Sequence, residues 1–391
     1  ASWPLGFNHP DITSDEASAE LLKAAHNKVA NSDLYTAELA EFVDTFGSRV
    51  SPEGYNHHFW VSGGALAVEN ALKTAFDWKA RKLGRTNFSD CVNDLGILHF
   101  KQAFHGRSGY TMSLTNTLPD KVGLFPKFDW PRVSNPFCEF DHDGNICNDI
   151  EAAEAVACAE IEAAFDKSEN KIAGILIEPM QGEGGDNHFR PDFLAKLRQY
   201  ADEREALLIF DEVQTGFYGS GKPWFWQTVG VKPDVVSFGK KTQTCGIYAN
   251  DRVNEVADNV FEKSSRINST WGGNLVDMIR CKQFINIIER DNIADHVTQI
   301  GNHVIDGLRD IARTTDAFSS VRGCGSLIAF TLPTAAARGN MLNVLMDKGV
   351  IALPCGTRSV RFRLPLIMTM EEASTLLERT GEAVHSQAAT A

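Results

Sequence analysis

Residues 207–241, LLIFDEVQTGFYGSGKPWFWQTVGVKPDVVSFGKK, decide the fold of this chain. Two apolar runs, at 207–210 and 235–238, lie within this stretch, and charged residues follow closely after each of them. A strand that is buried on both faces has such a continuous apolar sequence, as in parallel sheets covered by helices. Open parallel sheets bind their ligands just beyond the carboxyl ends of the strands. The stretch therefore predicts two neighbouring strands, Leu207–Phe210 and Val235–Phe238, with a ligand site where they end.

The same alternation of short apolar runs and longer helical stretches occurs earlier in the chain. Two further strands are predicted at Gly96–Phe100 and Ile172–Ile177. An amphipathic helix is predicted at 65–82, directly after the small residues Ser62, Gly63 and Gly64. Strands that alternate with helices indicate an α/β fold, with a mostly parallel sheet flanked by helices.

The C-terminal part of the chain has a different pattern. A continuous helical stretch is predicted from Asn274 to about Thr314, followed by a compact α+β unit with helices near 335–348 and from Glu371. Because 391 residues are too many for one comfortable core, we expect an N-terminal segment at 1–30 on the small-domain side, a large domain at 31–280 and a small C-terminal α+β domain at 281–391. The boundary is predicted inside the long helix near 275–290, and the Ala-rich tail after Ser386 is predicted to be disordered.

The composition argues against several classes of function. The formal net charge is −13 and no long Lys/Arg block is present, so neither nucleic acid nor an anionic membrane is expected as a main partner. The chain shows no signal peptide and no apolar run of membrane-spanning length. Its eight cysteines form no C-x-x-C pair, which favours reduced thiols and a cytoplasmic location. His57-His58 lacks the spacing of metal ligands, so no metal site is predicted.

Polar side chains follow all four predicted strands. After 96–100 come Phe104, His105 and Arg107; after 172–177 come Glu178 and Glu183; after 207–210 come Asp211, Glu212 and Gln214; and after 235–238 come Lys240 and Lys241. A single acid after one strand is usually a solvated turn or a helix cap. A set that includes arginine, glutamate, aspartate and lysine at four strand ends instead favours a shared site at one edge of the sheet.

This set of residues suits one chemistry in particular. A lysine amine forms a Schiff base with an aldehyde cofactor, and a buried aspartate keeps the cofactor's pyridine nitrogen protonated, so that the ring accepts the electrons of a broken C–H bond. The free amides and dipole of a helix that opens at Ser62-Gly63-Gly64 suit a phosphate, and Phe104 could stack on the ring. The residues therefore predict a pyridoxal-phosphate enzyme.

Two competing nucleotide-binding motifs fail. Residues 216–222, GFYGSGK, fit the start of a phosphate loop, but Pro223 replaces the Ser or Thr that would hold magnesium and also lacks a backbone amide. No G-x-G-x-x-G sequence lies between a predicted strand and a predicted helix, which argues against a dinucleotide fold.

Taken together, these motifs closely resemble the class III (omega) aminotransferases over almost the whole chain. The stretch from Asp211 to Lys240 follows that family's D-E-V-x-x-G…P-D…K order, and VSGGALAVENALK, AFHGR, IEPMQGEGG and STWGGN match further family signatures. The resemblance implies fold type I of the pyridoxal-phosphate-dependent transferases and an obligate homodimer whose active sites are shared between subunits. It also implies a longer N-terminal segment ahead of ASWPLGFNHP, so we expect this chain to begin inside the family pattern.

Within the family, FGKKTQTCG, HHFWVSGGALAVENALK, FPKFDWPR and RINSTWGGN are similar to the branch that acts on the 6-amino group of L-lysine. That resemblance implies a ping-pong reaction with 2-oxoglutarate, which gives 2-aminoadipate 6-semialdehyde and L-glutamate. Ornithine and 4-aminobutyrate are alternative amino donors, because they differ from lysine by one or two methylenes, a difference worth only about 1–3 kcal/mol in a pocket. A non-catalytic protein of the same fold is the remaining alternative.

The resemblance assigns cofactor roles to residues of this chain. Lys240 is implied to be the Schiff-base lysine, because the family's spacing from Asp211 selects it over Lys241. Asp211 is implied to pair with the pyridinium nitrogen. The other implied cofactor contacts are Ser62, Gly63 and Gly64 at the phosphate, Phe104, His105 and Val213 around the ring, Gln214 at the ring hydroxyl, and Thr270 at the phosphate of the neighbouring subunit. For Thr270, a helix cap or a turn before Gly272-Gly273 is an equal alternative.

The substrate roles rest on the same resemblance. Arg107 and Arg361 are implied to anchor the two carboxylates, with Arg363 as a nearby alternative to Arg361, and Asn268 is assigned to the substrate site. Planar guanidinium groups suit carboxylates better than lysine does. Glu183 is implied to neutralise Arg361 while lysine reacts and to swing away for 2-oxoglutarate, because an unpaired buried arginine is costly. The alternative is that Glu183 only caps a loop.

Overall fold

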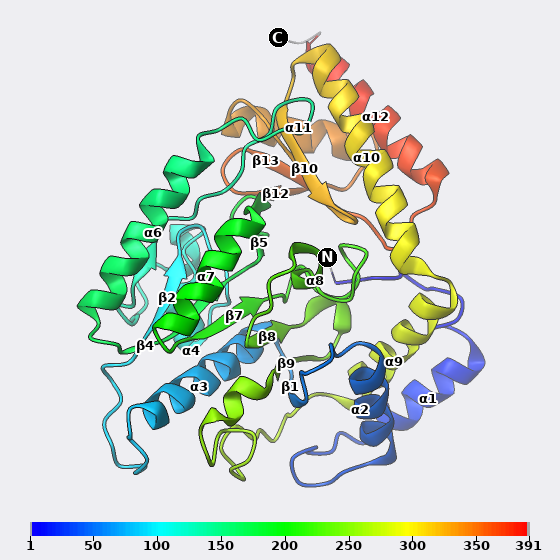
Figure 1. The fold of residues 1–391 in the computed structure, drawn as a ribbon. Coiled ribbons are helices and arrows are strands. Elements are labelled where there is room, and N and C mark those ends of the chain that lie inside the picture. Colours follow the sequence, from blue (N-terminus) through cyan, green and yellow to red (C-terminus); the bar gives the residue numbers. More distant parts are fainter. Residues whose placement is uncertain (1, 389–391) are drawn as a thin grey trace.

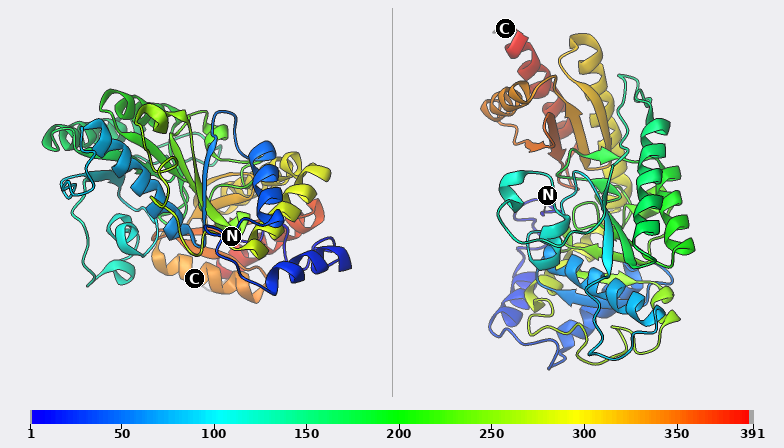
Figure 2. Two further views of the ribbon diagram at one scale, coloured as in Figure 1. Left: turned by 90° about the horizontal axis from the view of Figure 1, so that it is seen from below. Right: turned by 90° about the vertical axis from the view of Figure 1, so that its left-hand side faces the viewer.

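The computed structural model describes residues 2–388 (Figure 1). A large unit built on a central sheet carries a smaller C-terminal unit, which lies above it in the side view of Figure 2. Helix α12 (Met370–Ala388) reaches the end of the described range, and the remaining part of the tail that was predicted to be disordered, 389–391, lies outside the described residues.

The central sheet has seven strands in the order β1-β9-β8-β7-β4-β2-β3. The four predicted strands are its parallel centre: β2 (Gly96–Phe100), β4 (Ile172–Ile177), β7 (Leu207–Asp211) and β8 (Val235–Phe238). The strands that flank this centre, β1 (His57–Val61), β9 (Cys245–Ala249) and β3 (Arg132–Val133), were not predicted. β1 begins with two histidines and β9 contains Gly246, so neither has a long apolar run. The predicted α/β fold with a mostly parallel sheet is confirmed.

Both faces of the sheet are covered. Leu207, Ile209 and Val235 pack into the core under helix α3 (Gly64–Lys82). Their neighbours Leu208, Phe210 and Val236 lie in the opposite core, with α6 (Ile150–Lys167) and α7 (Pro191–Glu203). Successive side chains of a strand point to opposite faces, which explains why these strands need apolar residues at every position.

Short helices and hairpins complete the large unit. They are α1 (Asp15–Ala25), α2 (Ala37–Arg49), α4 (Gly109–Leu114), α5 (Pro119–Val122), β5 (Met180–Gln181), β6 (Asn187–His188), α8 (Trp226–Val229), the 3₁₀ turns η1 (Lys240–Thr242) and η2 (Asp251–Glu255), and α9 (Leu275–Arg290).

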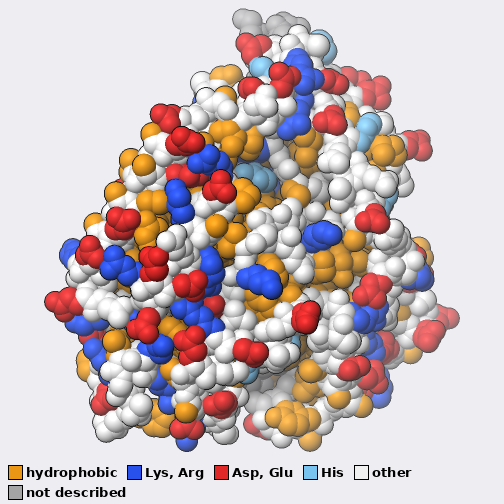
Figure 3. All heavy atoms as spheres, viewed as in Figure 1, with side chains coloured by type: hydrophobic (Ala, Val, Ile, Leu, Met, Phe, Trp, Pro, Cys, Tyr) orange, Lys and Arg blue, Asp and Glu red, His pale blue; other side chains and the backbone are white. Residues whose placement is uncertain are grey.

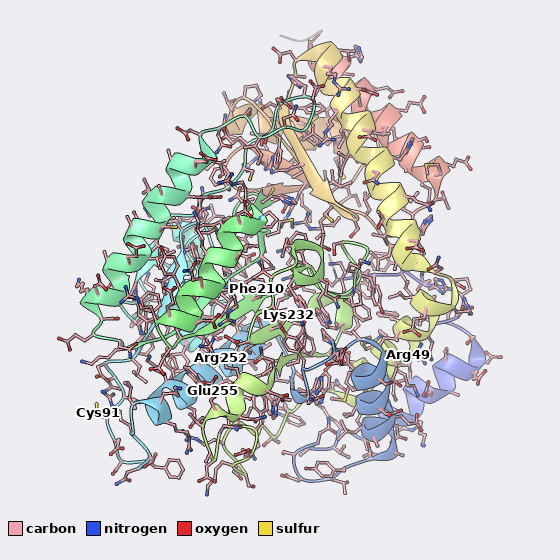
Figure 4. The ribbon with its side chains drawn as sticks, viewed as in Figure 1. Arg49, Cys91, Phe210, Lys232, Arg252 and Glu255 are labelled. Atoms are coloured by element: carbon pink, nitrogen blue, oxygen red, sulfur yellow. The ribbon has the colours of Figure 1, made fainter. Side chains whose placement is uncertain are left out.

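The acid at the amino end of β8 has a structural role. Asp234 Oδ2 accepts hydrogen bonds from the Leu208 amide at 2.8 Å and from Arg252 Nη1 at 2.9 Å. Figure 4 labels Arg252 and Phe210. Phe210 directly precedes Asp211, which ends β7. The two buried acids thus lie at opposite edges of the sheet, and only Asp211 lies at the carboxyl edge.

The long helix predicted from Asn274 to about Thr314 is two helices, so that prediction is wrong. α9 ends at Arg290 and α10 (Ile293–Thr315) begins after Asn292, whose backbone is left-handed with φ of 50°. Asn tolerates this conformation better than most residues. Core residues of α9 pack in the large unit, whereas those of α10 from Ile300 onward pack in the C-terminal unit. We propose that the domain boundary lies at this break.

The N-terminal segment packs with the large unit rather than only with the small one. Leu5 and Ala24 belong to the core of the large unit, and α1 lies against α9. The Pro4 carbonyl also accepts a hydrogen bond from the Leu366 amide of the C-terminal unit at 2.8 Å. The segment therefore connects the two units.

The C-terminal unit has the α+β pattern expected from its sequence. Its antiparallel sheet has the order β10-β11-β13-β12, with β10 (Ser319–Cys324), β11 (Leu327–Thr331), β12 (Leu353–Cys355) and β13 (Ser359–Arg363). α10, α11 (Ala335–Asp347) and α12 pack against it. β13 carries both Arg361 and Arg363 towards the large unit.

Four general features concern the sequence predictions. No described helix is both long and apolar enough to cross a membrane. All eight cysteines are free. Within residues 2–388, no three or more His, Cys, Asp or Glu side chains gather as metal ligands would. On the face shown in Figure 3, acidic and basic side chains are interspersed.

Candidate active site

The carboxyl ends of the parallel strands bring three of the predicted residues, Asp211, His105 and Val213, into contact. Asp211, the last residue of β7, is buried, and its Oδ2 atom hydrogen-bonds with His105 Nδ1 at 2.8 Å. Its Oδ1 atom accepts from the Val213 amide at 3.0 Å and from Ser237 Oγ at 3.2 Å. The carboxylate of Asp211 is therefore held in one orientation at the sheet edge. His105 Nε2 is buried without a protein partner.

Lys240 begins the turn that follows β8, with a left-handed φ of 54°. Its Nζ atom makes no hydrogen bond or ion pair with any described residue. Burial lowers the pKa of this amine, although the Asp211 and Glu178 carboxylates oppose the effect. An amine without a partner and with a lowered pKa is what formation of a Schiff base requires.

The neighbouring Lys241 has a structural role. It is almost fully buried, and its Nζ atom donates to the carbonyl oxygens of Gln214 at 2.9 Å and Gly216 at 3.4 Å. Burial lowers its pKa to about 7, and the nearby Arg363 and Lys240 charges act in the same direction. Lys241 thus stabilises the turn after β7. The contacts of their side chains therefore distinguish Lys240 from Lys241, which residue type alone could not do.

The start of α3 forms a cradle that suits a phosphate. Ser62 and Gly63 are exposed, Gly63 has a φ of 118°, and no side chain caps the helix. A Cβ atom on Gly64 would lie 2.8 Å from Val213 Cγ1, so only glycine lets the first turn of α3 approach the strand end this closely. Free amides at the positive end of a 19-residue helix favour an anion there. Together with Lys240 and Asp211, the cradle fits pyridoxal phosphate.

Glu178 is a buried acid that had no assigned role, although its place directly after β4 was a signal. Its Oε1 atom accepts from the Phe104 amide at 2.9 Å and its Oε2 atom from the Gly182 amide at 3.0 Å. Burial raises its pKa to about 7, and the Asp211 charge adds to this effect. Glu178 therefore positions the backbone of Phe104 beside the site.

The arginines of β13 meet Gln214. Its Oε1 atom accepts from Arg361 Nη1 and from Arg363 Nη2, each at 2.8 Å, so the amide group of Gln214 keeps its N–H donors for another partner. Arg363 also forms a two-pronged ion pair with the buried Asp186. Arg361 lies 3.8 Å from Asp186, and its Nε atom has no partner. The Nε atom of Arg363 is also buried without a partner, but both of its Nη atoms are bound, whereas only Nη1 of Arg361 is. Arg361 thus has more donors free for a carboxylate. Nothing in the sequence pattern pointed to Asp186.

Glu183 does not pair with Arg361 in this structure, so its pairing with Arg361 while lysine reacts stays a prediction. Glu183 Oε1 forms an ion pair with Lys121 Nζ and accepts a hydrogen bond from Thr117 Oγ1 at 2.9 Å. The charge of Arg361 faces Asp186 and Gln214 instead. Lys121 lies on the short helix α5 and pairs with Glu183, while Asp186 and Gln214 already lie against the guanidinium group of Arg361.

Three predicted residues lie away from these contacts. Arg107 is exposed and makes no hydrogen bond or ion pair with a described residue. Asn268 and Thr270 are also exposed, in the loop before α9. The N-cap of α9 is Asn274, not Thr270. A turn does contain Thr270, because the Gly272 amide donates a hydrogen bond to the Ser269 carbonyl at 3.0 Å. The roles of these residues stay predictions. Phe104 is half-buried, with Lys121 Nζ 5.5 Å from its ring centre.

Comparison with known proteins agrees with this geometry. Residues 1–384 match the family described as Aminotransferase class-III.

The chain belongs to the class-III aminotransferases.

Relatives of this class-III aminotransferase include the L-lysine-epsilon aminotransferase of Mycobacterium tuberculosis, 47% identical over 374 residues, which cover 95% of this chain and 82% of the relative. The enzyme of the same name from Amycolatopsis lactamdurans is 46% identical over 99% of this chain and 86% of its own. The mitochondrial 4-aminobutyrate aminotransferase of Mus musculus is 31% identical over 96% of this chain and 78% of its own.

A solved structure has the same fold. The lysine aminotransferase from M. tuberculosis in the internal aldimine form superimposes with a TM-score of 0.92 at 45% identity, covering 98% of this chain and 88% of that one. These findings confirm a pyridoxal-phosphate-dependent aminotransferase of fold type I.

Proposed function

We propose that this class-III aminotransferase transfers the 6-amino group of L-lysine to 2-oxoglutarate. The products are 2-aminoadipate 6-semialdehyde and L-glutamate, formed in a ping-pong sequence. The observation that carries the proposal is the 45–47% identity, over nearly the whole chain, to relatives named L-lysine-epsilon aminotransferase. The relatives named 4-aminobutyrate aminotransferase reach only 31%.

The residues of the site have roles that follow from their contacts. When bound, pyridoxal phosphate supplies an aldehyde carbon for the amine and a protonated ring that takes up the electrons of the broken C–H bond. Lys240 Nζ, with its lowered pKa, would remove the proton from Cε of lysine and would then deliver it to the cofactor carbon that carried the aldehyde. Asp211, oriented by His105 and Ser237, holds a proton on the ring nitrogen.

Two arginines would bind the substrate carboxylates. Arg361 has a free Nε donor and a side chain that is 13% exposed, which suits the carboxylate beside the reacting carbon of 2-oxoglutarate. Arg107, which has no partner within the described chain, would bind the carboxylate at the far end of either substrate.

We further propose a cytoplasmic homodimer with shared active sites. Several large apolar side chains are exposed in the first turn of α3, in segment 118–128 and in the loop before α9: Leu66, Leu118, Leu124, Phe125, Phe128 and Trp271. Exposed apolar surface of this kind is typical of a subunit interface. Thr270 and Asn268, next to Trp271, would then reach the partner's site. The eight unpaired cysteines favour the cytoplasm.

The test is a single half-reaction. L-Lysine is added without a keto acid to the cofactor-loaded protein, and the near-ultraviolet and visible absorbance is recorded. We expect the band of the lysine-linked cofactor to give way to that of pyridoxamine phosphate, with no such change in Lys240→Ala. Lys232→Ala, on an exposed lysine, is the matched control. A larger kcat/KM for ornithine or 4-aminobutyrate than for lysine would refute the lysine assignment.

A further inference from the structure

Arg361 faces a loop that carries two acids, Glu183 and Asp186. The Glu183 carbonyl accepts a hydrogen bond from the Gly356 amide at 2.8 Å, and Gly356 lies in the turn between β12 and β13. A Cβ atom on Gly356 would lie 2.8 Å from the Gly184 carbonyl oxygen. The loop and the hairpin with Arg361 are therefore packed backbone to backbone.

One of the two acids, Asp186, already has both carboxylate oxygens in hydrogen bonds. Asp186 is bound at both carboxylate oxygens by Arg363 and lies 3.8 Å from Arg361. Gln214 occupies one Nη atom of Arg361, and the Nε atom remains buried without a partner. Arg361 therefore retains donors for one more carboxylate, which can come from a substrate or from Glu183.

Glu183 is held in the other direction. Lys121 Nζ and Thr117 Oγ1 both bind its Oε1 atom. The pair is sheltered, since the side chain of Lys121 is 30% exposed and that of Glu183 is 21% exposed. Lys121 Nζ also lies 5.5 Å from the centre of the Phe104 ring, a second favourable contact that keeps the ammonium group in place.

We propose that Lys121 and Thr117 form a docking site that holds Glu183 away from Arg361, and that this site controls whether Arg361 binds a substrate carboxylate. The inference rests on the proposed function in one respect, the assignment of Arg361 as a carboxylate anchor. Lys121 and Thr117 are positioning residues, because they act on the substrate only through Glu183. Without them, Glu183 competes with the substrate as an intramolecular carboxylate.

The test compares the two half-reactions in cofactor-loaded, full-chain Lys121→Met. If Glu183 occupies Arg361 in nine of ten molecules, the apparent affinity for a diacid falls about tenfold, because only the remaining fraction is competent. We therefore expect the apparent Kd for L-glutamate to rise about tenfold with an unchanged rate constant at saturation. The Kd for L-lysine, which brings no carboxylate to Arg361, should not rise.

Two variants separate docking from general damage. Lys127→Met is the matched control, because Lys127 lies in the same segment and donates only to the Val122 carbonyl. Lys121→Met combined with Glu183→Gln should regain affinity for glutamate, since a neutral amide competes weakly for a guanidinium group. Binding of glutarate, a diacid that cannot react, is measured by calorimetry as a readout that is independent of turnover.

The outcomes are distinct. Equal losses for glutamate and lysine, or a double variant that does not recover, would overturn the docking site and leave Lys121 with a structural role. An unchanged glutarate affinity in Lys121→Met would overturn it as well. If the protein reacts with glutamate but not with lysine, the proposed amino donor fails while the docking site can still be supported by the glutamate and glutarate data.

Discussion

At the scale of single residues, environment separates side chains of identical type. Lys240 and Lys241 are adjacent, yet the amine of one has no described partner and that of the other is bound by two carbonyl oxygens. Asp211 and Asp234 are both buried, but one lies at the carboxyl edge of the sheet and the other at the amino edge. Function at this scale follows from which edge or turn a residue occupies.

The pKa of Lys241 leads to a prediction for stability. The folded value is about 7, against a usual 10.5, so between these pH values the unfolded chain binds a proton that the folded chain does not. The contribution of Lys241 to the free energy of unfolding therefore increases as pH rises from about 7 to 10.5. The same contribution is lost as pH falls through this range. Lys241→Met removes this contribution. Urea unfolding at pH 7.5 and 9.5 should show that the advantage of the natural protein over the variant grows at the higher pH.

Lys232→Met is the control for this experiment, because Lys232, labelled in Figure 4, is an exposed lysine that precedes β8, whereas Lys241 follows that strand. Its effect on the free energy of unfolding should be small and should not change with pH. A difference between natural protein and Lys241→Met that is the same at both pH values would show that the amine is not desolvated as described.

At the scale of elements, the approach of α3 to the end of β7 builds the phosphate cradle. Gly64→Ala places a methyl group 2.8 Å from Val213 Cγ1 and must push the helix or the strand end away. Such overpacking costs about 1–3 kcal/mol, which corresponds to a loss of cofactor affinity of about 5- to 160-fold if the cradle carries the strain. The Kd for pyridoxal phosphate, from fluorescence titration of the apoprotein, measures this effect.

Gly339→Ala makes the same chemical change where it meets nothing within 4 Å, on helix α11. Alanine at such a helical site stabilises a protein by about 0.4–1 kcal/mol, chiefly because the unfolded chain loses conformational freedom. Cofactor affinity should be unaffected. Equal cofactor affinities in Gly64→Ala and Gly339→Ala would show that the close approach of α3 to β7 does not contribute to cofactor binding.

At the scale of the whole molecule, the described chain leaves Thr270 and Asn268 exposed beside apolar side chains. Shared sites predict complementation between two inactive variants. Lys240→Ala lacks the amine, and Thr270→Asp would repel the phosphate of the neighbouring subunit. A dimer of one subunit of each kind has one intact site, with Lys240 from one subunit and Thr270 from the other.

Unfolding and refolding an equal mixture should therefore restore about a quarter of the natural activity, because half of the dimers are mixed and each has one of two sites. The two variants refolded separately serve as controls and should stay inactive. No recovery in a mixture that sedimentation shows to contain dimers would place Thr270 outside the partner's site.

The sequence by itself determined the sheet centre and the chemistry at its edge. The four parallel strands were predicted within one residue, because strands buried on both faces need unbroken apolar runs. Lys240, Asp211 and Ser62-Gly63-Gly64 could be proposed from the sequence, because they lie at strand ends and at a helix start, where ligands of parallel sheets bind. β1, β9 and the break at Asn292 were missed, because their residues also suit loops or a continuous helix.

Only the tertiary structure decided which charges pair. Glu183 was assigned to Arg361 by sequence, yet it binds Lys121, and Asp186, which no pattern singled out, binds Arg363. An ion pair depends on the relative position of two side chains to within about an ångström, since charge-assisted hydrogen bonds form only at short range. That position is set by the paths of loops packed against each other from distant parts of the chain, such as the contact between Glu183 and Gly356. Residue types and spacings along one segment do not contain this information.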